Sequence, residues 1–124
     1  MTAAQAPRLL ADPRPVIVAR GDRHVLAGGR CRACGHALTR PLPRCPWCRG
    51  EVAAERFGPE GSVWAVTVLH VPAGDRDAPY TLGYVDLDDG PRLLVHLSER
   101  AAIGDRVRLA EPTPAGDPAA EVLA

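Results

Sequence analysis

The sequence predicts a mainly β protein, with a small metal-binding ribbon in its first half and a small barrel in its second half. Two Cys-x2-Cys pairs stand ten residues apart in the first half. Short β-branched runs separated by turn residues fill the second half. Thirteen prolines and twelve glycines among 124 residues favour short strands over long helices.

Residues 1–19 form the first predicted segment, an N-terminal arm. It is rich in Ala and Pro up to about residue 15 and shows little periodicity, so we expect it to be flexible or to dock on a partner. The run at residues 16–19, Val-Ile-Val-Ala, is expected to be a strand or a segment ordered by that partner.

Residues 20–57 form the predicted ribbon, which is built around Cys31, Cys34, Cys45 and Cys48. Two residues between cysteines let both sulfurs converge on one ion, and Gly35 supplies the unusual backbone angles of such a turn. Two pairs complete a closed tetrahedral site, which indicates one structural zinc ion and leaves no open coordination position. Pro41, Pro43 and Pro46 exclude a helix between the pairs.

Disulfides, free thiols and a rubredoxin-like iron site are the alternatives for the four cysteines. No apolar run is long enough for a signal peptide or a membrane span, so we expect a soluble cytoplasmic protein. Paired cysteines in that compartment bind metal more often than they form disulfides. Iron sites are usually shielded by aromatic side chains, and the block from Cys31 to about Gly50 offers only Trp47. Zinc is therefore the prediction, and absorption of visible light would distinguish iron.

Residues 58–111 form the predicted barrel. Strands are expected at residues 62–71, 80–87, 92–97 and 106–109, because these runs are rich in β-branched and apolar residues. Asp88-Asp89-Gly90 predicts a hairpin turn, since Asp-Gly tolerates positive φ. Four or five short strands predict closure into a barrel, which removes exposed edges. Residues 112–124 are Pro/Ala-rich and are expected to be a flexible C-terminal tail.

The order of these motifs resembles the acyl-CoA-associated zinc-ribbon/OB-fold family, known as DUF35. The resemblance runs from about residue 25 to residue 110. Its residues are Gly29–Gly35, Pro43–Cys48, Gly61–Val68, Ala78–Gly90 and Ile103–Val107. It implies a rubredoxin-like zinc ribbon followed by a five-stranded OB-fold barrel.

The resemblance also implies an accessory subunit that is not catalytic alone. Members of this family accompany thiolase-like acyltransferases, aldolases and hydratases that act on acyl-CoA, and CoA or acyl substrate can lie at the interface. Seven arginines and one aspartate give residues 20–50 a charge of +6 in a chain of net charge zero. Three of them, Arg40, Arg44 and Arg49, are the candidate contacts to an acidic partner or to CoA phosphates.

Two other functions are compatible with the motifs. Zinc ribbons and OB folds also bind single-stranded nucleic acid, but the barrel half is acidic and offers only Trp64, Tyr80 and Tyr84 for stacking, so nucleic acid is not the expected partner. An electron carrier would need the iron alternative. No nucleophile beside a base, phosphate-binding loop or dinucleotide motif is present, which argues against catalysis by this chain alone.

Overall fold

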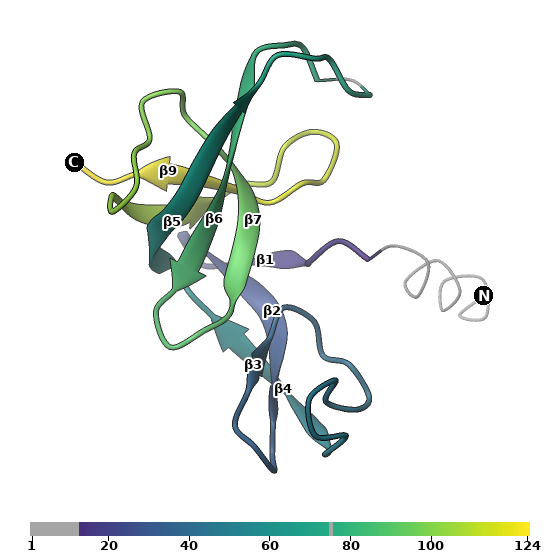
Figure 1. Ribbon diagram of the computed structural model, residues 1–124. Helices are drawn as coiled ribbons and strands as arrows, with labels where there is room; N and C mark the ends of the chain where they lie inside the picture. Colours follow the sequence, from purple (N-terminus) through teal and green to yellow (C-terminus); the bar gives the residue numbers. More distant parts are fainter. Residues whose placement is uncertain (1–12, 75) are drawn as a thin grey trace.

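The computed structural model describes residues 13–74 and 76–124, which form nine β-strands in two sheets. No helix occurs in the described residues, so none could cross a membrane there. Figure 1 shows the two sheets as separate bodies joined at one end, the ribbon below and the barrel above. The mainly β class predicted from the sequence is confirmed.

The ribbon sheet is organised around one long strand, β2 (Arg23–Cys31). Its first half pairs antiparallel with β1 (Ile17–Arg20), and its second half pairs with both β3 (Ala37–Leu38) and β4 (Val52–Phe57). Gly28 permits this crowding, because a Cβ there would lie 2.4 Å from the Leu38 carbonyl oxygen. β2 ends at Cys31, the first of the four predicted metal ligands.

The second sheet is a closed barrel of five strands in the order β5-β6-β7-β9-β8. Only the β7–β9 contact is parallel. Asp89 adopts a φ of 55° in the predicted turn between β6 and β7. The strands are β5 (Glu60–Leu69), β6 (Tyr80–Leu87), β7 (Arg92–Leu97), β8 (Arg106–Ala110) and β9 (Ala119–Val122).

The predicted flexible tail is wrong at residues 119–122, because these residues form β9 and close the barrel between β7 and β8. Ala120 pairs with Leu109 and is only 7% exposed. Its small side chain joins the core, so an Ala-rich segment is ordered by what packs around it. In the predicted N-terminal arm, residues 17–19 belong to β1, and residues 1–12 lie outside the described part of the chain.

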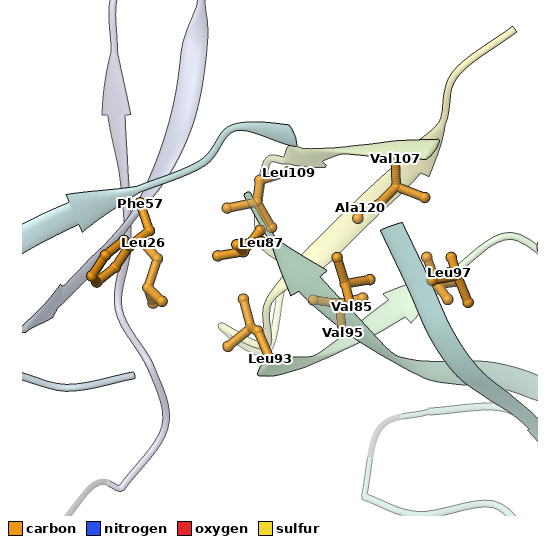
Figure 2. Close-up of a cluster of buried hydrophobic side chains, with 11 residues drawn as sticks. Leu26, Phe57, Val85, Leu87, Leu93, Val95, Leu97, Val107, Leu109 and Ala120 are labelled. Carbon is orange, nitrogen blue, oxygen red and sulfur yellow. The ribbon is translucent and has the colours of Figure 1, made fainter. Parts of the chain in front are cut away.

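One hydrophobic core serves both sheets. Figure 2 shows Leu26 and Phe57 from the ribbon beside Leu87, Leu93 and Leu109 from the barrel. Each of these five side chains is at most 4% exposed. The ribbon is therefore packed on the barrel through buried apolar surface, and its position relative to the barrel is set by that packing.

Candidate metal centre

The first cysteine pair forms a tight turn at the end of β2. The backbone N–H groups of Ala33 and Cys34 point at the Cys31 sulfur, at 3.3 and 3.4 Å. The Gly35 N–H donates to the Cys31 carbonyl oxygen at 3.0 Å, and Gly35 adopts a φ of 78°. As the sequence indicated, glycine supplies the left-handed backbone that closes this knuckle.

The second pair repeats the same hydrogen bonds fourteen residues later. The Trp47 N–H points at the Cys45 sulfur at 3.4 Å, and the Arg49 N–H donates to the Cys45 carbonyl oxygen at 2.8 Å. Arg49 thus takes the place that Gly35 has in the first knuckle, and its φ of 65° is also left-handed. The two knuckles face each other as near copies.

The four sulfurs are arranged as ligands of one ion. All lie within 4.8 Å of one another, the Cys31–Cys48 and Cys34–Cys45 sulfur pairs at 3.4 and 3.7 Å. Tetrahedral metal–sulfur bonds of about 2.3 Å place sulfurs about 3.8 Å apart, whereas a disulfide would need about 2.05 Å. All four cysteines are free thiols. The cluster can therefore bind a metal ion, and its sulfur separations do not fit a disulfide.

Deprotonation of these clustered thiols is linked to the binding of a cation. The hydrogen bond from the Cys34 N–H, with the other amide and thiol contacts, lowers the pKa of Cys31 to about 6. The His36 N–H lowers the pKa of Cys34, but desolvation and the neighbouring thiols outweigh it and raise that pKa to about 12. Several thiolates this close together repel one another unless a cation lies between them, so metal binding would release protons.

Small residues and two rings surround the cluster. A Cβ on Gly50 would lie 2.8 Å from the Ala33 Cβ and 3.0 Å from the Cys31 sulfur, so only glycine fits there. On the exposed side, the rings of His36 and Trp47 meet edge to face with centroids 5.2 Å apart. The metal cluster consists of cysteines alone, and His36 instead packs on the second knuckle.

Arg30 connects the ribbon to the barrel. Its guanidinium donates to both carboxylate oxygens of Glu55 at 3.0–3.1 Å and to the carbonyl oxygen of Asp89 in the β6–β7 turn at 2.7 Å. It also lies 5.3 Å from the Phe57 ring centroid. This side chain therefore holds β2, β4 and the barrel hairpin in one arrangement, a role that the sequence did not indicate.

The three arginines predicted to contact a partner or CoA lie in two different parts of the ribbon. Arg44 and Arg49 are exposed on the second knuckle, on either side of Cys45 and Cys48. Arg40 is half-buried and lines a groove of about 400 Å³ with Pro15, Val16 and other residues. Two other arginines of the basic block are paired with acids that follow it, Arg30 with Glu55 and Arg32 with Glu51. The basic field of the ribbon is therefore weaker than the count over residues 20–50 suggests.

Comparison with known proteins identifies the family. Residues 54–110 match a family model described as ChsH2, C-terminal OB-fold domain. A DUF35 domain-containing scaffold protein of Pyrococcus furiosus is 33% identical over 69% of this chain and 68% of its own length. The chain belongs to the DUF35 family. This confirms the resemblance that the motif order indicated.

Other relatives extend the comparison. A DUF35 domain-containing scaffold protein of Methanocaldococcus jannaschii is 32% identical over 58% of this chain, and the benzoylsuccinyl-CoA thiolase subunit BbsA of Thauera aromatica is 29% identical over 64%. The matches span 54% and 56% of those proteins. A chain of the Ltp2-ChsH2(DUF35) aldolase superposes with a TM-score of 0.63 and 28% identity, covering 78% of this chain and 84% of that one.

Proposed function

We propose that this DUF35 chain is a non-catalytic accessory subunit that packs on a thiolase-like or aldolase-like enzyme acting on acyl-CoA. The observation that carries the proposal is the similarity to both a thiolase subunit and an aldolase chain. The second of these likenesses spans the ribbon and the barrel together, because it covers 78% of the chain. We also propose that this subunit helps to bind CoA or the acyl substrate at the interface with its partner.

The metal centre fits a structural role in such a subunit. Four thiolates saturate a tetrahedral ion, so no position is left for a substrate or for an activated water. We propose zinc as the ion, because an all-cysteine tetrahedral set from two Cys-x2-Cys knuckles suits zinc. Metal analysis of the purified protein checks this: one zinc per chain and no visible absorption are expected, and a red protein containing iron would contradict it.

Co-expression tests the accessory role. The chain would be co-expressed with a thiolase-like or aldolase-like subunit of the same organism and separated by size-exclusion chromatography. We expect one complex whose acyl-CoA activity is lost when this chain is omitted. Two proteins that migrate independently, with full activity in the enzyme alone, would show the proposal to be wrong.

A further inference from the structure

The outer surface of the barrel differs in character from one side to the other. Antiparallel barrels usually place apolar residues inside and polar residues outside. The β8 strand follows this rule, since Arg106 and Arg108 are exposed. On β5, β6 and β7 the outward residues include Trp64, Tyr84 and Leu94, which are 52%, 43% and 45% exposed. Figure 1 shows these three strands side by side on one face. Exposed apolar residues gathered on one face indicate an interaction surface.

Arg92 extends this surface toward the ribbon. Its guanidinium carbon lies 3.6 Å from the Trp64 ring centroid, and the Trp64 and Tyr84 rings meet edge to face at 6.3 Å. Asp86 accepts two hydrogen bonds from Arg92 at 2.7 and 3.1 Å and holds the guanidinium in place. The barrel side of the surface is therefore fixed by its own contacts.

A cleft of about 470 Å³ continues the surface onto the ribbon. Arg92, Pro91 and Gly90 line it from the barrel, and His36, Ala37, Leu38 and Thr39 line it from the ribbon. Beyond His36 lies Trp47, which is 70% exposed. Ring contacts on the barrel and on the ribbon thus lie at the two sides of this cleft, which separates Arg92 from His36. We call the surface formed by these residues the aromatic strip, and its members are Tyr84, Trp64, Arg92, His36 and Trp47.

We infer that the aromatic strip is the surface on which the partner enzyme subunit docks, through an apolar patch that carries acidic side chains at the ribbon end. This inference rests on the accessory role proposed above. Trp, Tyr and Arg are the residues that most often dominate the energy of protein interfaces. Arg44 and Arg49 flank Trp47, and within the described residues neither forms an ion pair. The ribbon end of the strip is therefore complementary to acidic side chains on the partner.

The charge of the barrel favours a protein over single-stranded nucleic acid. OB folds that bind single strands stack bases on aromatic side chains but also track the phosphates with a basic groove. Residues 58–111 carry nine acidic residues and five arginines. The single arginine of the strip, Arg92, is neutralised by Asp86. The strip has the rings for stacking, but the barrel around it lacks the positive charge that phosphates need.

Tryptophan variants test the inference. Trp64→Ala and Trp47→Ala would be compared with wild type for affinity to the co-expressed enzyme subunit, measured by calorimetry. Val71→Ala is the matched control, because Val71 is 73% exposed in the loop after β5 and lies outside the strip. Each tryptophan variant is expected to weaken binding by at least about ten-fold. The control should bind within about two-fold of wild type. Zinc content and thermal melting must equal those of wild type, which both exposed positions should allow.

The outcomes separate the two proposals. If wild type binds no thiolase-like or aldolase-like subunit, the accessory role itself is wrong. If wild type binds and both tryptophan variants bind equally well, the accessory role stands and the docking surface is wrong. A fluorescein-labelled single-stranded oligonucleotide is the further probe. Binding at low salt that is lost in Trp64→Ala would assign the strip to nucleic acid and overturn the inference.

Discussion

Arg49 shows how a single residue can depart from what its backbone position prefers. It holds a φ of 65° at the place where the first knuckle has Gly35, with a φ of 78°. A left-handed conformation costs a residue with a Cβ about 1–2 kcal/mol, of which the extra unfolded-state freedom of glycine offsets about 0.5–1 kcal/mol. The residue at this position therefore tunes the stability of the second knuckle.

We predict that Arg49→Gly stabilises the metal-bound protein by about 1 kcal/mol. Arg49→Ala is the matched control, because it removes the same side chain but keeps the Cβ and hence the unfavourable backbone. Urea unfolding in the presence of zinc measures both. An equal stability of the two variants would show that the backbone conformation of Arg49 is not the cause.

The four candidate ligands, Cys31, Cys34, Cys45 and Cys48, could be predicted directly from the sequence, but the residues that pack around them could not. The Cys-x2-Cys spacing brings the two sulfurs of each pair together, and two such pairs ten residues apart are typical of one metal site. The repeat of hydrogen bonds in the knuckles was also accessible, since Arg49 follows Cys48 as Gly35 follows Cys34. Arg30 gave no such signal, because its partners, Glu55 and Asp89, lie 25 and 59 residues away.

Some strands of the barrel could be predicted from local sequence signals, whereas others depend on contacts with distant parts of the chain. β6 and β7 were predicted with the bounds that the structure has, because the turn at Asp88–Gly90 and the flanking apolar runs are local signals. β9 was missed because residues 119–122 have no strand pattern of their own and are ordered by β8 and β7. The outward aromatic residues of β5 and β6 were seen but were not assigned to a docking face, because the face depends on how three strands lie together.

Asp117 anchors the loop that leads into β9. The hydrogen bond from the Arg76 guanidinium, helped by Arg14 and His96, lowers the pKa of its carboxyl below the usual 3.8. The Asp117 side chain is only 12% exposed. The backbone N–H of Asp117 donates to the Thr113 hydroxyl at 3.1 Å. The pKa of Asp117 in the folded state lies below its unfolded value of 3.8. The carboxylate therefore stabilises the fold at pH values above 3.8, and this stabilisation is lost as the pH falls through the folded-state pKa.

We predict that Asp117→Asn costs about 1–3 kcal/mol at pH 7 and that the difference from wild type shrinks below about pH 4. Asp77→Asn, which changes an exposed aspartate without an ion pair in the described residues, is the control. Denaturant unfolding at matched pH isolates the effect, since any loss of metal in acid affects both proteins alike. A constant difference between pH 7 and pH 3 would contradict the prediction.

At the scale of the whole molecule, the ribbon and barrel are one folding unit. Leu26 and Phe57 are at most 4% exposed and pack among barrel residues, and Arg30 ties β4 to the β6–β7 turn. The first knuckle begins where β2 ends, five residues after Leu26. Disorder of the knuckles would therefore reach the shared core through β2, and the barrel would lose the side chains that close one end of it.

We predict that removing the metal destabilises the barrel as well as the ribbon. Structural zinc sites of this kind contribute about 10–16 kcal/mol of apparent binding free energy at pH 7, which is comparable to the stability of a whole domain. The metal-bound protein should unfold in one cooperative transition, and a strong chelator should lower the midpoint and expose the amides of β2, β4 and β7 to hydrogen exchange. Cys31→Ser should behave like the chelated protein.

The same experiment ties the metal to the docking surface. His36 and Trp47 pack on the second knuckle, so chelation should abolish partner binding even where some barrel structure remains. The contacts that hold the barrel end of the strip, Arg92 with Asp86 and Trp64 with Tyr84, do not involve the cysteines. Restoring zinc after chelation should therefore recover binding together with the protection of the ribbon amides. Two separate unfolding transitions in the metal-bound protein, or full partner binding without metal, would show that the ribbon and barrel do not act as one unit.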